Sequence, residues 1–214
     1  MRKTKRLLEK NSLGLHVGGM GVIKKIYLLR HGETAWTKSG QHTSFTDIEL
    51  TPNGRWEAKR LGKTIKHIKF DYVFSSPVKR ARETFKLAGF KEAEVKIDPR
   101  LLEWNYGDYE GLTTKEIHKT NPGWTIFTQD PPSGETAKEI EKRVDDLLKC
   151  ASSLDGLVAF VSSAHVTRVI GARWLKMPVS FGQHLLLSTG AKSILGYEHA
   201  SPVLCTWNDT SHLE

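Results

Sequence analysis

Two arginines and a histidine stand where a binding site for an anion would need them. Arg30 and His31 follow one apolar run of the chain, and Arg80 comes shortly after a second run that ends in two serines. A guanidinium group binds two phosphate oxygens at once and stays charged at any relevant pH. It also stabilises the charge that phosphoryl oxygens carry in a transition state. Two such groups beside an imidazole therefore predict a site for a tetrahedral dianion.

His31 is the member of this set that could form a covalent bond with phosphorus. A neutral imidazole is a competent nucleophile, and a covalent intermediate divides one difficult displacement into two easier ones. We expect the positive field of Arg30 and Arg80 to lower the pKa of His31, which keeps its ring unprotonated near neutral pH. The pattern thus predicts phosphoryl transfer to a histidine.

Strands and helices alternate along the part of the chain that must position these residues. This alternation is typical of a sheet covered by helices on both faces, so the predicted fold class is α/β, with three layers and a mostly parallel central sheet. Polar residues follow three of the strands, and ligands of such sheets bind beyond the carboxyl ends of the strands. The expected strands are 23–29, 71–75, 95–97, 157–161, 193–197 and 203–207, and the expected helices are 51–68, 77–88 (capped by Ser76), 113–120, 135–152 and 164–176.

Length and charge indicate one domain with a basic extension. A chain of 214 residues is long enough for one sizeable domain. Residues 1–21 are expected to be a basic N-terminal extension, for which disorder is one interpretation, and 22–214 the histidine-containing domain. Most of the net charge of +8 lies in residues 1–25, and the rest of the chain is nearly balanced. A nucleic-acid groove needs a basic stripe on the folded domain, so no nucleic-acid partner is predicted.

The remaining composition predicts a cytoplasmic protein without a membrane span. No apolar run reaches the length that a bilayer requires, and the N-terminus has no apolar segment typical of a secretory signal. Cys150 and Cys205 have no metal-ligand spacing, and we expect them to be reduced, buried thiols. No metal and no cofactor are predicted, and the sequence does not indicate an oligomeric state.

Residues 28–34 (LLRHGET) resemble the signature of the histidine phosphatase superfamily, in its phosphoglycerate-mutase-like branch. The resemblance continues in the same order through nearly all of the chain after Met20, with features of the broad-specificity phosphatases. Its further segments are 39–43 (SGQHT), 46–48 (TDI), 50–52 (LTP), 75–84 (SSPVKRARET), 102–113 (LEWNYGDYEGLT), 133–136 (SGET), 172–175 (ARWL), 195–199 (LGYEH) and 207–208 (WN).

The resemblance implies a role for each matching residue. His31 would become phosphohistidine, and Arg30 and Arg80 would clamp the phosphate. Glu103 matches the family's general acid, which protonates the leaving group and then acts as base for the hydrolytic water. Further contacts are implied at Thr37 for phosphate, and at Thr43 and Ser44 for phosphate or substrate. At Ser44 the chain departs from the glycine that the family prefers.

The second histidine of the family motif is missing from its expected place. The family has Ser-His-Gly after the fourth strand, five residues before an arginine, and counting back five from Arg168 reaches Ser163. Ala164 replaces the glycine, and His165 falls two positions later. Two helical positions rotate a side chain by about 200°, so His165 cannot face the pocket from the same backbone.

Three interpretations of this departure are open. The start of the helix could be reshaped so that His165 reaches the phosphate. Ser163 could donate a hydrogen bond at the helix N-terminus instead. Alternatively, the site could be impaired, because the loss of a cationic donor would lower the rate by about 10²–10³ by analogy with a deleted oxyanion-hole donor.

The function predicted from the whole pattern is a phosphomonoesterase that hydrolyses small phosphorylated metabolites through phosphohistidine. A phosphoglycerate mutase would use the same site, sugar bisphosphatases share much of the loop signature, and a catalytically weak phosphometabolite-binding protein would explain Ser163. The pocket mouth is expected within the variable segment 104–134, with Tyr106, Trp124 and Phe127 as candidate walls. The sequence does not identify the substrate.

Overall fold

A computed structural model describes residues 23–214, and the expected N-terminal extension lies outside them. One six-stranded sheet runs through this part of the molecule in the order β3-β2-β4-β1-β5-β6. The pairs among β1, β2, β3 and β4 are parallel, and β5 and β6 join antiparallel. The strands are β1 (Ile23–Arg30), β2 (Tyr72–Ser75), β3 (Val95–Ile97), β4 (Gly156–Ser162), β5 (Lys192–Glu198) and β6 (Ser201–Asp209).

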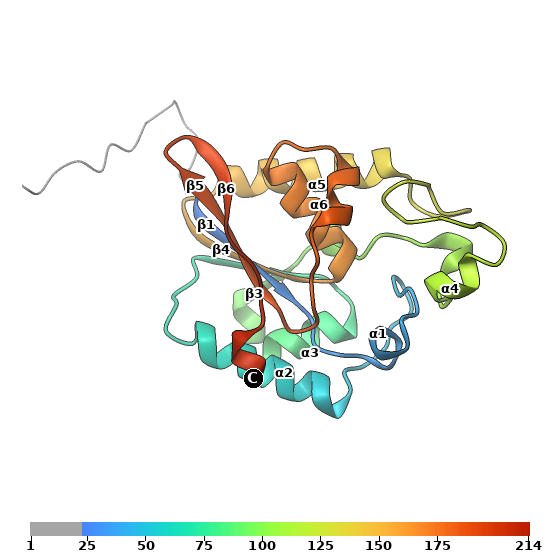
Figure 1. The fold of residues 1–214 in the computed structure, drawn as a ribbon. Coiled ribbons are helices and arrows are strands. Elements are labelled where there is room, and N and C mark those ends of the chain that lie inside the picture. The colour runs from blue at the N-terminus through green and yellow to red at the C-terminus, as the bar shows by residue number, and fades with distance from the viewer. Residues whose placement is uncertain (1–22) are drawn as a thin grey trace, which may run out of the picture.

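Helices cover both faces of the sheet. Figure 1 shows α2 and α3 on one face and α5 and α6 on the other, which confirms the predicted three-layer α/β fold. The short helices α1 and α4 lie near each other beyond the sheet (Figure 1), where Gln41 and Thr113 form an isolated β-bridge. The helices are α1 (Ala35–Ser39), α2 (Pro52–Ile65), α3 (Lys79–Leu87), α4 (Thr114–Ile117), α5 (Ala137–Ser152) and α6 (Ala164–Trp174).

Strand β1 shows how the sequence builds the two layers. Its side chains alternate between the faces because successive residues of a strand point in opposite directions. Ile26 and Leu28 pack into the core under α5 and α6, whereas Tyr27 and Leu29 pack into the core under α2 and α3. Both faces are therefore apolar, as the continuous apolar run predicted.

The order and type of the predicted elements agree with the structure, and the differences concern their ends. Helix α2 begins after Thr51, whose hydroxyl accepts the N–H of Gly54, but it ends at Ile65, three residues before the predicted end. Helix α6 ends at Trp174, and Lys176 adopts a left-handed conformation that stops the helix. The predicted helix 113–120 is the four-residue α4, which begins with a capping box at Thr113.

The prediction that Ser76 and Pro77 cap helix α3 is wrong. The helix begins at Lys79, and Val78 in the capping position makes no side-chain hydrogen bond. Asp47, from a loop distant in sequence, accepts the N–H of Lys79 at 2.6 Å instead. A carboxylate at this end also interacts favourably with the helix dipole. Local sequence could not reveal this cap because it comes from another part of the fold.

The prediction that both cysteines are buried is also wrong. Cys150 lies on α5 and Cys205 on the edge strand β6, and both are exposed and free. The buried stripe of α5 consists of Ile140, Val144, Leu147 and Ala151, which places Cys150 off the core-facing side. Within residues 23–214, no helix is long and apolar enough to cross a membrane.

Candidate active site

Three of the predicted site residues, Arg30, His31 and Ser163, lie at the carboxyl ends of two neighbouring strands. Strands β1 and β4 are adjacent and parallel, with Arg30 in register with Ser162, so His31 and Ser163 follow side by side. The backbone N–H of His31 donates to Ser162 O at 2.9 Å. Strand β2 lies on the other side of β4, and Ser76 N donates to Val161 O. The carboxyl ends of β1, β4 and β2, which are far apart in sequence, thus lie side by side at one end of the sheet.

Arg80 and Arg30 are both held by backbone carbonyl groups. Arg80 is fully buried, and its guanidinium donates to the carbonyl oxygens of Thr43, Ser44 and Thr46 at 3.0–3.2 Å. Arg30 Nη1 donates to Leu187 O. Within residues 23–214, no carboxylate forms an ion pair with either arginine. Both positive charges are therefore fixed in place by neutral partners.

Several buried polar atoms at this edge have no hydrogen-bond partner among the described residues. They are Arg30 Nε, Arg80 Nε, Ser76 Oγ and Ser163 Oγ. A buried donor without a partner costs about 1–3 kcal/mol, so native proteins rarely keep one without a reason. Four of them at three neighbouring strand ends are what a site for a hydrogen-bond acceptor such as phosphate requires.

His31 is oriented and tuned as a nucleophile. Its Nδ1 lies 2.8 Å from Gly32 O, and because a carbonyl oxygen only accepts, Nδ1 must carry the proton. In the neutral ring, Nε2 then has a free lone pair. Burial, followed by the charges of Arg80 and Arg30, holds the pKa of His31 well below its usual value. The ring is therefore neutral at neutral pH, as the sequence predicted.

The segment that carries His31 is tied directly to the helix that carries Arg80. Gly32 N donates to Thr84 Oγ1 at 3.2 Å, and the same hydroxyl donates to Arg80 O at 2.7 Å. Gly32 also packs closely against helix α2, since a Cβ at this position would lie 2.2 Å from Gly54 O. The position of His31 relative to Arg80 is thus set by the Thr84 hydroxyl and by backbone packing against α2.

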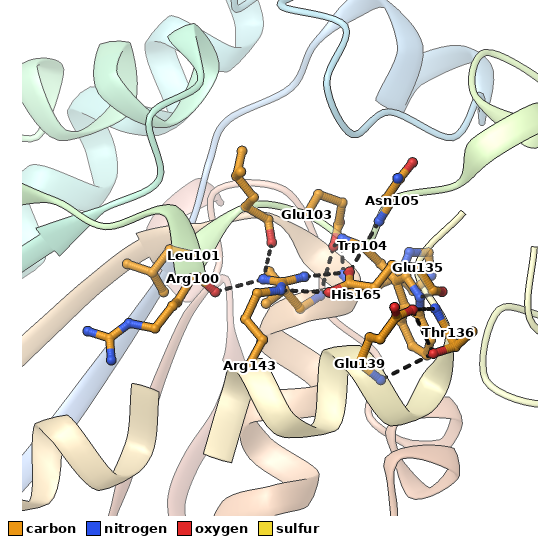
Figure 2. A network of polar contacts seen from close by, with 12 residues as sticks. Arg100, Leu101, Glu103, Trp104, Asn105, Glu135, Thr136, Glu139, Arg143 and His165 are labelled. Atoms are coloured by element: carbon orange, nitrogen blue, oxygen red, sulfur yellow. Dashed lines mark hydrogen bonds and ion pairs between the residues drawn. The ribbon is translucent and has the colours of Figure 1, made fainter. Parts of the chain in front are cut away.

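Glu103 lies at the N-terminus of helix α6, where both of its oxygens accept hydrogen bonds. Oε2 accepts from His165 N at 2.9 Å, and Oε1 accepts from Val166 N at 2.8 Å and Trp104 N at 2.9 Å. Figure 2 shows Glu103 beside His165 in a polar network that continues through Arg143 and Glu135. Burial lowers the pKa of both Arg30 and Arg80, and the negative charge of Glu103 partly opposes this.

Ser163 and His165 differ sharply in their surroundings. Helix α6 begins regularly after Ser163, whose hydroxyl makes no capping bond and is buried. The helix start is therefore not reshaped. His165 turns to Tyr106, whose hydroxyl pairs with its Nδ1, and the ring packs against Phe127 with 5.3 Å between centroids. This geometry favours the interpretation in which Ser163 faces the anion.

The side chains of Thr37, Thr43 and Ser44 are engaged with protein partners. Thr37 forms a capping box with Thr34 at the start of α1. Thr43 Oγ1 donates to Gln41 O, and Ser44 Oγ donates to a carboxylate oxygen of Glu110 at 2.8 Å. Their predicted contacts with phosphate or substrate stay predictions.

Two cavities open near the strand ends. One of about 490 Å³ contains Glu103 and Phe45 in its wall. The other, of about 410 Å³, is lined by His165 and Arg168 together with His42, Trp124 and Phe127. Two of the three predicted wall residues, Trp124 and Phe127, thus line a cavity. Within residues 23–214, no group of histidine, cysteine, aspartate or glutamate residues is arranged to hold a metal ion.

Sequence reasoning missed Arg168 and Glu110 as members of the site. Arg168 was used only to count back to Ser163, yet its charge influences the pKa values of Arg30 and His165, lowering both. Glu110 belongs to the segment 102–113 that carried the resemblance, but nothing local indicates that it reaches the loop at Ser44. A contact between residues 66 positions apart has no signal in one sequence.

Comparison with known proteins identifies the family and agrees with this fold. The model of the "Histidine phosphatase superfamily (branch 1)" matches residues 26–210. An acid phosphatase of Mycobacterium tuberculosis is 38% identical over 194 residues, which cover 88% of this chain and 94% of that protein. Sedoheptulose 1,7-bisphosphatase of Saccharomyces cerevisiae is 36% identical over 140 residues, covering 55% of this chain and 51% of that protein.

A solved structure has the same fold. The protein encoded by an open reading frame from Mycobacterium tuberculosis superposes on this chain with a TM-score of 0.81 at 37% sequence identity, and the match covers 86% of this chain and 97% of the other. The fold is a mostly parallel sheet, and Arg30 and His31 stand at the end of its strand β1. The chain belongs to the histidine phosphatase superfamily, branch 1, which confirms the prediction of a histidine phosphatase.

Proposed function

We propose that this protein is a phosphomonoesterase that hydrolyses small phosphate esters through a phosphohistidine on His31. The observation that carries the proposal is the set of unpartnered buried donors from Arg30, Arg80 and Ser163 around a neutral histidine. A phosphate dianion would accept hydrogen bonds from all of them and would balance two positive charges. The name of the acid phosphatase relative supports the same activity.

The first step is the attack of His31 Nε2 on phosphorus. The N–P bond forms as the ester P–O bond breaks, and the bonding electron pair leaves with the alcohol oxygen. The hydrogen bond from Nδ1 to Gly32 O holds the ring in the reactive tautomer. Arg30 and Arg80 stabilise the charge on the nonbridging oxygens, where fixed donors are most effective because they need no reorganisation.

Glu103 is the proposed proton donor for the leaving oxygen. Its oxygens accept backbone N–H groups at the start of α6, so a protonated Glu103 would exchange one of these contacts for the leaving oxygen. In the second step the carboxylate takes a proton from water, the water oxygen bonds to phosphorus, and the N–P bond breaks. Phosphate and free His31 result, and Glu103 is again protonated.

Ser163 is proposed to donate a hydrogen bond to the phosphate in place of the family's second histidine. Its hydroxyl is buried, unpartnered and at the strand end beside His31. A neutral hydroxyl stabilises a developing negative charge less than an imidazolium does. The proposal therefore includes a lower rate than a site with the histidine would give.

Turnover of an aryl phosphate by the purified full-length chain tests the function. We expect measurable hydrolysis that is lost in His31→Ala, with inorganic phosphate still bound by the variant. His67→Ala, which changes an exposed histidine in the turn after helix α2, should retain full activity. Phosphate binding without turnover in the unaltered protein would instead support the weakened binding protein. Transfer of the phosphoryl group to a second metabolite rather than to water would support the mutase.

A sugar bisphosphatase is a second candidate because of Arg168. Its guanidinium stacks on Phe127 at 4.4 Å, donates to the carbonyls of Gly182 and Gln183, and lines the 410 Å³ cavity. Within residues 23–214 it has no carboxylate in an ion pair, so a second anionic group of a substrate could use its charge. One relative is named a sedoheptulose bisphosphatase.

Arg168→Gln separates these candidates. If the substrate carries a second phosphate, the variant should lose kcat/KM for sugar bisphosphates by about tenfold or more, as loss of one charged hydrogen-bond partner predicts. Its kcat/KM for a monophosphate should change little. Arg173→Gln is the matched control, since Arg173 lies on the same helix but pairs with Asp145 and Glu141.

A further inference from the structure

A single peptide group connects a carboxylate to the phosphate-clamp arginine. The peptide between Thr43 and Ser44 presents its N–H to Glu110, with Ser44 N at 2.9 Å from both carboxylate oxygens. Its carbonyl oxygen, that of Thr43, accepts from Arg80 Nη2 at 3.2 Å. The negative and positive side chains thus lie at opposite ends of one amide dipole.

Glu110 also holds the rest of this loop. Its Oε1 accepts from Thr46 N at 3.1 Å, and its Oε2 accepts from Ser44 Oγ at 2.8 Å. Next to it, Gly111 N donates to His42 O, and His42 N donates to Leu112 O. Residues 110–112 therefore hold the loop 42–46, through its N–H groups and through His42 O.

Arg80 binds the carbonyl side of the same loop. Besides Thr43 O, it donates to Ser44 O at 3.0 Å and to Thr46 O at 3.2 Å. Both nitrogens at the end of the guanidinium donate hydrogen bonds in this way, and Nε is buried with no partner among residues 23–214. The loop therefore fixes the plane of the guanidinium, and this plane decides where Nε points.

We infer that Glu110 is a positioning residue for the phosphate clamp, which acts on Arg80 through the Thr43–Ser44 peptide. The inference rests on the proposed role of Arg80 in binding phosphate. The carboxylate orders the loop so that its carbonyls hold the guanidinium plane, and it leaves Nε available for the anion. A direct ion pair would occupy the same N–H groups and weaken the hold on phosphate.

The electrostatic arrangement suits this indirect contact. Burial lowers the pKa of Arg80, and the negative charges of Glu103 and Glu110, among others, oppose that effect. An amide whose N–H faces a carboxylate is polarised so that its carbonyl is a stronger acceptor for the guanidinium. Glu110 thus supports the charged arginine without touching it.

Glu110→Gln tests the inference. The amide keeps the shape and one acceptor oxygen, but its NH₂ would face Ser44 N–H, and the loop would lose contacts. We expect the Kd of inorganic phosphate, measured by calorimetry, and kcat/KM for an aryl phosphate to worsen by about ten- to a hundredfold, the range for a misplaced group near the chemistry. Glu110→Asp, which keeps the charge, should recover part of the loss.

Glu83→Gln is the matched control. Glu83 accepts the N–H of Leu50 at 3.2 Å further along the same loop and pairs with Arg55, with no contact to the peptide that Arg80 binds. Its loss should affect thermal stability more than phosphate affinity. A comparable loss of phosphate affinity in both variants would mean that Glu110 only stabilises the loop, and it would overturn the inference.

Combination with Arg80→Ala gives the sharpest test. If Glu110 acts through Arg80, Glu110→Gln should lower kcat/KM far less in the Arg80→Ala background than in the unaltered protein. An equal loss in both backgrounds would contradict the inference. The phosphate Kd is measured by calorimetry and needs no turnover. If the unaltered protein proves inactive, the proposed function is refuted, and the role of Glu110 is still judged from the phosphate Kd.

Discussion

Glu103 caps helix α6 at the position that the side chain of Ser163 leaves open. The carboxylate accepts the N–H groups of His165 and Val166, and the hydroxyl of Ser163 makes no capping bond. Serine in this position usually caps the helix itself. Here the Ser163 hydroxyl makes no capping bond and lies buried beside His31, where it could donate a hydrogen bond to an anion.

Ser163→His should raise kcat for an aryl phosphate by at least about tenfold, because an imidazolium supplies the cationic donor that the serine lacks. The reverse change, Ser163→Ala, should lower kcat by a smaller factor. Steady-state kinetics at saturating substrate measure both. An unchanged kcat in Ser163→His would mean that other groups of the site already compensate for the missing histidine.

Glu103→Gln should affect esters of weakly acidic alcohols more than aryl phosphates. An alkoxide needs a proton as it leaves, whereas a phenolate leaves readily without one, so a missing general acid matters only for the former. We expect a loss of about 10²–10⁴ in kcat/KM, which reports only the step that forms phosphohistidine, for alkyl phosphates and a much smaller loss in kcat/KM for a nitrophenyl phosphate. Equal losses for both substrates would contradict the role as proton donor.

The pKa of His31 predicts the acid limb of the pH–rate profile. Protonated imidazole cannot attack phosphorus, and burial together with Arg80 and Arg30 holds the pKa of His31 well below 6.5. The value of kcat/KM should therefore not fall as the pH drops through 6.5, and should decline only at lower pH.

The same profile should shift in Arg80→Gln. Removal of a neighbouring positive charge raises the pKa of His31, so the acid limb should move to higher pH. Arg82→Gln serves as control, because Arg82 lies on the same helix but pairs with Glu92 at the surface. Identical acid limbs in the unaltered protein and Arg80→Gln would show that the arginine does not tune His31.

Gly32→Ala should destabilise the protein and abolish turnover. The new Cβ would lie 2.2 Å from the backbone oxygen of Gly54, so either helix α2 or the segment carrying His31 must move. Such overpacking costs about 1–3 kcal/mol. Gly54→Ala meets Glu33 O at 2.1 Å from the other side and should have the same effect. Thermal unfolding and aryl phosphatase assays measure the two losses.

Asp47→Ala should lower both stability and activity by removing the cap of α3. The carboxylate accepts the N–H of Lys79, next to Arg80, and loss of a cap costs about 1 kcal/mol. Asp130→Ala removes the corresponding bond to Ala137 N at the start of α5. We expect both variants to lose a similar amount of Tm. If kcat/KM falls in Asp47→Ala but is unchanged in Asp130→Ala, the cap of α3 affects activity through Arg80.

The sequence by itself predicted the layers and the strand ends at which the proposed anion site lies. The continuous apolar run in β1 predicted two buried faces, and Arg30, Ser76 and Ser163 stand at the ends of runs that were predicted as strands. These inferences succeeded because strand periodicity and parallel pairing are local rules with fixed geometric consequences.

Only the tertiary structure decided which partners each polar group takes. Asp47 as the cap of α3, Glu103 as the cap of α6, and Glu110 behind Arg80 all come from segments distant in sequence. A hydrogen bond depends on positions within a few tenths of an ångström, which no spacing along the chain specifies. The chemical groups at the site were readable from the chain, whereas the contacts that orient them were fixed by folding.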